Sequence, residues 1–308
     1  MKVLITCPPM LRQMDDFIHH FEERGVEVAL PDVVQTLSVS ELKEMVPLCD
    51  GWIIGDDPAN REVLECGVRG RLRSAIKWGS GVDNVDFQAA ADLGLPVRNT
   101  PGMFGNEVAD VALAYVIGLA RELYWIDREV RSGRWSKPAG VSLAGKKAAL
   151  VGLGHVGRQV ARRLLVCGME VVAYDPFFEG EAEVEIRSWP DDMEDADFLV
   201  LTCALTDANR HMVDADVLSH CKPGLRVVNV ARGPLIDEEA LCSALGSGQV
   251  YSAALDVFEI EPLGEESPLR SFERCILGTH NGSNTVDAVR RTSELAITML
   301  FEQLETAS

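Results

Sequence analysis

The sequence is poor in basic side chains. Its 308 residues contain 29 Lys and Arg against 48 Asp and Glu, a formal charge of −19 with neutral histidines. A surface of that sign repels phosphate backbones and anionic lipid, so nucleic acid and a membrane surface are disfavoured as main partners. A small anion can still bind in one local basic pocket, because net charge does not describe a single cleft.

Long apolar runs are also lacking. The longest, 111–120, is well short of the about 20 residues that span a bilayer. The apolar stretch near the amino end, 3–6, is too short for the hydrophobic region of a signal peptide. We therefore expect a water-soluble, cytoplasmic protein.

No Cys-x-x-Cys pair, Cys/His cluster, internal repeat or Gly/Ser/Pro-rich linker is visible. The eight cysteines are scattered along the chain. In an acidic chain of this kind, scattered cysteines indicate reduced, mostly buried thiols and neither disulfides nor a metal site.

What is present is an alternation of short apolar runs with amphipathic stretches, typical of a parallel sheet covered by helices on both faces. The first series of predicted strands is 3–6, 26–30, 51–55 and 75–78. The second series is 148–151, 170–174, 198–202, 226–230, 252–257 and 275–278. Ligands in such sheets bind beyond the carboxyl ends of the strands.

Two further stretches have helical periodicity. Between the two series, 106–131 carries apolar residues on two faces, which predicts one helix bridging two domains or lying at a subunit interface. The last stretch, 285–304, has one apolar stripe, and the pattern does not indicate which domain it packs on.

A glycine motif opens the second series. Gly152, Gly154 and Gly157 fit G-x-G-x-x-G, and the motif lies between an apolar strand and a helical stripe, as a dinucleotide-binding loop requires. The first glycine allows a tight turn, the second lets the backbone approach a pyrophosphate, and the third lets the helix pack on the strand. We expect the backbone N–H groups of His155 and Val156, at the helix N-terminus, to face the phosphates.

An acidic residue closes the next strand. Asp175 can accept hydrogen bonds from both ribose hydroxyls of NAD, and its charge repels a 2′-phosphate. Residues 176–178 supply no Lys or Arg to receive that phosphate. The sequence therefore predicts NAD in preference to NADP, and a strand–turn–helix without a ligand is the less favoured interpretation.

Three charged or titratable residues follow apolar strands of the second series. Arg232, Glu261 and His280 each stand just beyond such a strand. Any one of them has an ordinary structural explanation, as a cap or an ion pair. All three at the carboxyl edge of the sheet that carries the glycine loop indicate a catalytic site.

With these residues in view, the chain resembles the D-2-hydroxyacid dehydrogenases, the family of phosphoglycerate, glyoxylate/hydroxypyruvate and D-lactate dehydrogenases. The resemblance covers nearly the whole length. The matching segments are 77–86, Asn99-Thr100-Pro101-Gly102, Val108-Ala109-Asp110, the glycine loop, Asn229-Val230-Ala231-Arg232-Gly233, Leu255-Asp256-Val257-Phe258, Glu261-Pro262 and His280.

The resemblance implies an α/β protein of two doubly wound parallel-sheet domains. A discontinuous flavodoxin-like substrate domain comprises 1–98 plus 283–308, and a Rossmann NAD-binding domain comprises 99–282. It also implies a homodimer formed around the bridging helix. Trp135 matches a family Trp in that region, and we interpret it as interface packing.

The resemblance further implies NAD-dependent interconversion of a 2-keto acid and a D-2-hydroxy acid. Arg232 would clamp the carboxylate and the carbonyl oxygen, because a guanidinium offers a planar charged fork. Backbone N–H groups of Ser80, Gly81 and Val82 would hold the other side of the carboxylate. His280 would donate the proton, and Glu261 would orient the ring and favour its protonated form.

The remaining implied contacts are with the cofactor. Asp256 would meet the nicotinamide carboxamide, and Ala231 would lie against the cofactor. Cys203 stands near the expected adenosine, where the family commonly has histidine.

The substrate itself is less defined. Where phosphoglycerate dehydrogenases place an arginine for the phosphate, this chain has Gly55-Asp56-Asp57. That favours a small 2-keto acid such as glyoxylate or hydroxypyruvate, with phosphorylated or phosphonate-bearing acids second. Asn281 and Asn284 depart from the family pattern beside His280 and leave substrate choice open.

Other functions remain possible on this architecture. NAD-binding transcriptional corepressors share it, and so does a sensor that binds NAD without turnover. Formate dehydrogenases of the same superfamily replace the acidic partner of the histidine with glutamine, so Glu261 argues against them. Turnover of a 2-keto acid distinguishes the dehydrogenase from the two binding proteins.

Overall fold

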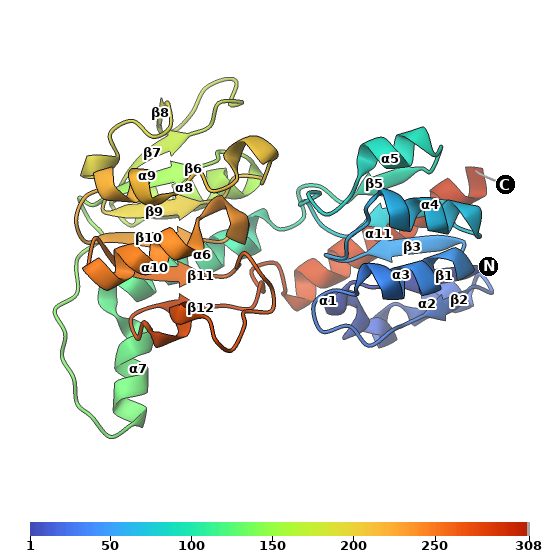
Figure 1. The fold of residues 1–308 in the computed structure, drawn as a ribbon, viewed down its shortest axis with the longest axis horizontal. Coiled ribbons are helices and arrows are strands. Elements are labelled where there is room, and N and C mark those ends of the chain that lie inside the picture. The colour runs from blue at the N-terminus through green and yellow to red at the C-terminus, as the bar shows by residue number, and fades with distance from the viewer. Residues whose placement is uncertain (307–308) are drawn as a thin grey trace. The chain divides into compact units, whose positions relative to one another are not determined.

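The computed structural model describes residues 1–306 and divides into two compact units. The first unit comprises Met1–Phe104 and the chain from Ser283 onward, and the second unit comprises Gly105–Gly282 (Figure 1). Each has its own all-parallel sheet. The prediction of two parallel α/β sheets is therefore confirmed.

The first unit has a five-stranded sheet in the order β2-β1-β3-β4-β5. Its strands are β1 (Lys2–Ile5), β2 (Glu27–Ala29), β3 (Gly51–Ile54), β4 (Ser74–Lys77) and β5 (Val97–Asn99). Its helices are α1 (Pro8–Leu11), η1 (Met14–Asp16), α2 (Ile18–Glu22), α3 (Val39–Met45), η2 (Val46–Leu48), α4 (Arg61–Arg69), α5 (Phe87–Asp92) and α11 (Val286–Thr306).

The C-terminal helix α11 completes this first unit by packing against β3 and β4. A Cβ at Gly51 would lie 3.2 Å from the side chain of Leu300, so the helix sits directly on the strand. Trp78 donates from Nε1 to Ser293 Oγ at 3.1 Å. These contacts settle the placement that helical periodicity alone leaves open.

The second unit has a seven-stranded sheet in the order β12-β11-β10-β9-β6-β7-β8. Its strands are β6 (Lys147–Val151), β7 (Glu170–Tyr174), β8 (Glu185–Arg187), β9 (Phe198–Leu201), β10 (Leu225–Asn229), β11 (Val250–Leu255) and β12 (Ile276–Leu277). Its helices are α6 (Gly105–Arg121), α7 (Leu123–Arg131), α8 (His155–Val166), η3 (Met193–Asp195), η4 (Asp207–Asn209), α9 (Ala215–His220), η5 (Gly233–Leu235), α10 (Glu238–Ser247) and η6 (Pro268–Ser271).

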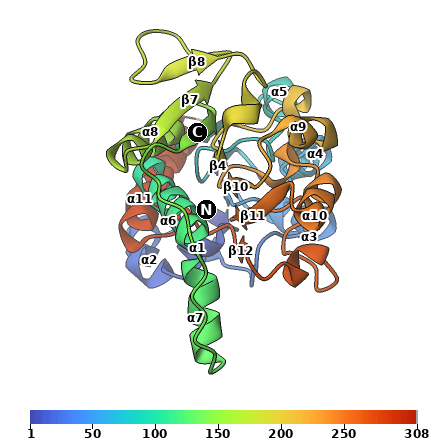
Figure 2. The same ribbon diagram turned by 90° about the vertical axis from the view of Figure 1, so that its left-hand side faces the viewer.

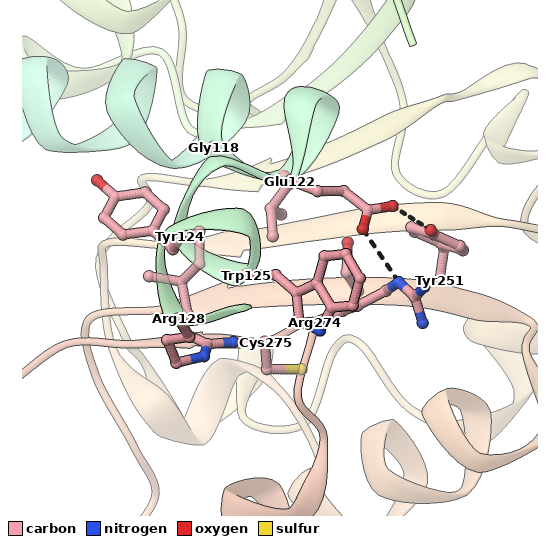
Figure 3. A pocket seen from close by; sticks show the side chains of 11 residues that line it. Gly118, Glu122, Tyr124, Trp125, Arg128, Tyr251, Arg274 and Cys275 are labelled. Carbon is pink, nitrogen blue, oxygen red and sulfur yellow. Dashed lines mark hydrogen bonds and ion pairs between the residues drawn. The ribbon is translucent and has the colours of Figure 1, made fainter. Parts of the chain in front are cut away.

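The prediction of a single helix over 106–131 is wrong. The segment forms two helices, α6 and α7, which are separated at Glu122. Glu122 has a left-handed backbone (φ 53°), which no α-helix can continue through. Its carboxylate is buried, accepts a hydrogen bond from the Tyr251 hydroxyl and pairs with Arg274 at 3.2 Å (Figure 3). Beyond this break, α7 projects away from the sheet of its unit (Figure 1, Figure 2).

Three properties of residues 1–306 bear on function. All eight cysteines are free thiols, as the sequence predicts. No group of three or more His, Cys, Asp or Glu side chains in that range is placed to hold a metal ion. No helix there has the length and apolar character needed to cross a membrane.

Candidate active site

The glycine loop joins β6 to α8 in the geometry that the motif predicts. Gly152 has φ +90°, and a Cβ there would lie 2.7 Å from the Cys203 backbone. A Cβ at Gly157 would lie 2.1 Å from the Gly152 carbonyl oxygen, so the helix rests directly on the turn. A Cβ at Gly154 would meet nothing within 4 Å. That open space beside the backbone fits a pyrophosphate.

The N-terminus of α8 has no side-chain cap. Its N-cap residue is Gly154, and its first turn carries no acidic side chain. The first N–H groups of a helix lack partners within the helix and favour an anion, so the backbone of His155 and Val156 suits a phosphate. The His155 ring itself lies against Gly105 at the start of α6.

Asp175 follows β7 and is held beside the glycine loop. Its Oδ2 accepts the Leu153 N–H at 2.7 Å, and its Oδ1 accepts the Phe177 N–H at 3.0 Å. Each carboxylate oxygen has a second lone pair that can accept a ribose hydroxyl. The residues present therefore fit a dinucleotide.

Cys203 follows β9 and is packed against this loop. Burial raises the pKa of its thiol to about 11, so the group is neutral near pH 7. Thr202, the residue before it, donates from Oγ1 to the Gly152 carbonyl at 2.8 Å. The end of β9 thus supports the turn.

A buried asparagine shapes the turn that carries Arg232. Asn229 ends β10; its Oδ1 accepts the Ala231 N–H at 3.0 Å and its Nδ2 donates to the Arg232 carbonyl at 2.8 Å. A Cβ at Gly233 would lie 1.8 Å from the Phe258 carbonyl carbon. The Arg232 turn is therefore pressed against the segment that leads to Glu261.

Glu261 and His280 form a close pair. Glu261 Oε2 lies 2.8 Å from His280 Nδ1, and Glu261 Oε1 accepts the Phe258 N–H at 3.0 Å. The side chains are 19% and 22% exposed, so the pair is shielded and one edge remains accessible. Because Nδ1 faces a carboxylate, we assign the proton on that nitrogen to this hydrogen bond.

The three candidate catalytic residues each follow one of three neighbouring strands at the carboxyl edge of one parallel sheet. Arg232 follows β10, Glu261 follows β11 and His280 follows β12. The hollow drawn in Figure 3 lies at the opposite end of β11, where its lining includes Tyr251 and Ser252. A strand rises about 3.3 Å per residue, so that hollow is separate from the Glu261–His280 pair.

The predicted substrate loop Ser80–Val82 lies in the first unit, just after β4. Gly79 has φ +119° and donates its N–H to Thr100 Oγ1 at 2.7 Å. Ser80 Oγ accepts the Gly102 N–H at 3.2 Å. The loop is therefore held by the segment that follows β5.

Sequence reasoning assigned no supporting role to three polar residues that hold these loops. Asn229 holds the Arg232 turn, Tyr115 donates to Asp256 Oδ1 at 3.4 Å, and Lys77 reaches the Gly55 carbonyl at 2.7 Å. All three are buried. A polar residue at the end of an apolar strand was the available signal for Asn229 and Lys77. No such signal marks Tyr115 within its helix.

Comparison with known proteins agrees with this geometry. A family model described as D-isomer specific 2-hydroxyacid dehydrogenase, NAD binding domain, matches residues 113–282. The hydroxypyruvate reductase of Thermotoga maritima is 34% identical over 274 residues, which cover 87% of this chain and 89% of that protein.

Two further relatives extend the likeness. D-3-phosphoglycerate dehydrogenase 3 of Arabidopsis thaliana is 38% identical over 264 residues, 83% of this chain but 45% of that protein, so the chain spans less than half of it. The structure of D-lactate dehydrogenase from Escherichia coli superposes with a TM-score of 0.83 at 26% identity, over 100% of this chain and 98% of that one.

The fold and the glycine loop define an NAD-dependent dehydrogenase. The chain belongs to the D-isomer specific 2-hydroxyacid dehydrogenase family. Its cofactor is NAD, which when bound carries the hydride of the reaction, and its substrate is a small molecule.

Proposed function

We propose that this dehydrogenase reduces a small 2-keto acid to the D-2-hydroxy acid with NADH, and that His280 is the acid. The observation that carries the proposal is the 2.8 Å Glu261–His280 pair, which stands at the carboxyl edge of the NAD-binding sheet. An imidazole backed by a carboxylate is the usual form of a general acid that works near neutral pH.

In reduction, the His280 imidazolium donates its Nε2 proton to the keto oxygen while C2 receives the hydride. Glu261 keeps the ring oriented and offsets its positive charge. In oxidation, neutral His280 accepts the hydroxyl proton, and bound NAD would supply the hydride acceptor. The proton and the electron pair balance in both directions.

Arg232 is proposed to bind the substrate carboxylate from the second unit, and the backbone N–H groups of Ser80–Val82 remain proposed carboxylate donors of the first unit. The Arg232 turn is rigid, since Asn229 brackets it and Gly233 is pressed on Phe258. The guanidinium donates from Nη1 to the Ala231 carbonyl at 2.8 Å, and its planar fork suits a planar anion in a two-pronged hydrogen bond.

The charges in the first unit favour a substrate whose side group is uncharged. Lys77, 3% exposed, donates to the Gly55 carbonyl at 2.7 Å and to Asp56 Oδ1 at 2.9 Å, so its charge is balanced within the unit. Burial raises the pKa of Asp57, which favours its neutral form. A strand edge without surplus positive charge suits glyoxylate or hydroxypyruvate better than a phosphorylated or phosphonate-bearing acid.

The test is loss of NADH absorbance with glyoxylate, hydroxypyruvate, pyruvate, phosphohydroxypyruvate and phosphonopyruvate. We expect turnover of glyoxylate or hydroxypyruvate, with the phosphate-bearing acid at least about tenfold lower in kcat/KM because Lys77, the cation at this strand edge, is already paired with Asp56. A reversed ranking would reject the small-acid assignment. No turnover at all, with NADH still bound by fluorescence, would instead favour an NAD-binding corepressor or sensor.

We also propose a homodimer formed around α6 and α7. Large apolar side chains are exposed on α7 and just beyond it: Leu123, Tyr124, Val130 and Trp135, the last 79% exposed. An exposed apolar group of this kind on a projecting helix suits a second copy of the chain.

Light scattering coupled to size-exclusion chromatography measures this state. We expect a dimer mass for the native chain and a shift toward monomer when Leu123 and Val130 are both changed to Ser. A monomer mass for the native chain at micromolar concentration would reject the dimer. The Val34→Ser variant, whose exposed apolar side chain lies in the first unit, is the matched control.

A further inference from the structure

The backbone at His280 adopts a conformation that side chains rarely take. His280 has φ 53°, in the left-handed region that favours glycine. Such a residue persists only where its surroundings hold it, and held residues of this kind gather at functional sites. The contacts around this turn therefore determine where the imidazole points.

One buried acid supplies those contacts. Asp256 is 3% exposed and directly follows β11. Its carbonyl oxygen accepts the His280 N–H at 2.6 Å, its Oδ1 accepts the Asn281 N–H at 3.2 Å, and its Oδ2 accepts the Gly282 N–H at 2.8 Å. Three successive N–H groups of the turn thus converge on one residue.

Tyr115 on α6 reaches the same carboxylate. Its hydroxyl donates to Asp256 Oδ1 at 3.4 Å, and the tyrosine is 8% exposed. Burial, together with the negative charge of Asp256, raises the pKa of Tyr115, so the phenol keeps its proton and remains a donor.

The space around this contact is closed. A Cβ at Gly278 would lie 2.3 Å from Asp256 Oδ1 and 2.5 Å from the Tyr115 hydroxyl. Gly278 also donates its N–H to the Leu255 carbonyl at 2.7 Å. The Asp256 carboxylate, the Tyr115 phenol and the chain at Gly278 are therefore closely packed against one another.

We propose that Tyr115 and Asp256 are a pair of positioning residues that hold the His280 turn in its left-handed backbone and so aim the imidazole. The family resemblance gives Asp256 only a contact with the nicotinamide carboxamide and gives Tyr115 no role. This inference rests on the proposed function, because His280 matters to turnover only if it is the acid.

The first variant is Asp256→Asn. It replaces one carboxylate oxygen, which accepts a backbone N–H, with an NH₂ group, which cannot accept one. The turn then loses its left-handed backbone, and a displacement of about 1 Å at a catalytic group costs about a hundredfold in turnover. We expect that loss in kcat at saturating NADH, where a weaker contact with the nicotinamide carboxamide does not limit turnover. Tyr115→Phe, which removes one long hydrogen bond, should lower kcat by about threefold to tenfold in the same way.

The matched control is Tyr251→Phe. It also removes a phenol that donates to a buried carboxylate of the second unit, that of Glu122 (Figure 3), but at the opposite end of β11. We expect kcat and NADH binding to stay at the native values in this variant.

Hydrogen exchange by mass spectrometry gives a readout that does not need turnover. Amides of Asn281 and Gly282 should exchange about tenfold faster or more in Asp256→Asn, since asparagine keeps one acceptor oxygen for the two N–H groups that the carboxylate accepts. Both amides should keep the native rate in Tyr251→Phe. Weaker NADH binding with native kcat and native exchange would overturn the proposal in favour of a nicotinamide contact alone. Native exchange rates and a native kcat in Tyr115→Phe would show that Tyr115 is not a positioning residue.

The same readouts separate this inference from the proposed function. If the native chain reduces no 2-keto acid, the proposed function fails, while the exchange rates still decide whether Asp256 and Tyr115 hold the turn. If turnover is found and exchange at 280–282 does not respond to either variant, the positioning pair fails alone.

Discussion

Replacing His280 with glutamine is expected to lower kcat for 2-keto acid reduction by about 10²–10⁴, the usual contribution of a general acid. Glutamine can still donate to Glu261 Oε2, which now lies 2.8 Å from the imidazole, but it cannot transfer a proton to the substrate. Binding of NADH should remain native, because the glycine loop and Asp175 lie elsewhere on the sheet. Stopped-flow loss of NADH absorbance measures the step.

The native enzyme should also show the matching dependence on pH. Reduction needs the protonated imidazole, so its rate falls as pH rises and His280 loses its proton, and oxidation rises over the same range. His220→Gln is the control, since that imidazole is exposed on α9. Native rates in His280→Gln, or an unchanged pH dependence there, would exclude His280 as the acid.

Replacing Arg232 with alanine should lower kcat/KM for the 2-keto acid by about 10³, because a charged group that binds both the carboxylate and the developing oxyanion is lost. Arg232→Lys should recover little of this, since an ammonium lacks the planar fork. Affinity for NADH should stay native. Steady-state kinetics in both substrates separates these effects.

Arg162→Lys is the control for the lysine variant, because Arg162 is exposed and pairs with Glu183 on the surface of the same unit. An ordinary hydrogen bond contributes at most about tenfold to kcat/KM. If Arg232→Ala loses no more than that, another residue binds the carboxylate.

The sequence predicts the two sheets because their central strands are short, mostly apolar runs. The strands it does not predict, β5 and β8, lie at sheet edges, are three residues long and are at most half-buried, so they leave no apolar run. The break at Glu122 is also unpredicted. Apolar spacing continues on both sides of it, and the cause is a pairing with Arg274, 152 residues away in the chain.

The candidate site is likewise predicted from the sequence only in part. Glycine spacing and strand-end positions point to the cofactor loop, Arg232, Glu261 and His280, because parallel strands gather their carboxyl ends at one edge. The supports of these residues are not predictable from local pattern. Tyr115 meets Asp256 across 141 residues of sequence, and only the folded sheet brings the two together.

The placement of α11 in the first unit has a consequence for the order in which the chain is completed during synthesis. Strands β1 to β5 are made before the second unit, but the helix that covers β3 and β4 is made after it. The second unit is one contiguous segment and has every strand of its sheet before α11 emerges. On the ribosome, therefore, the nucleotide-binding unit is expected to mature before α11 completes the first unit.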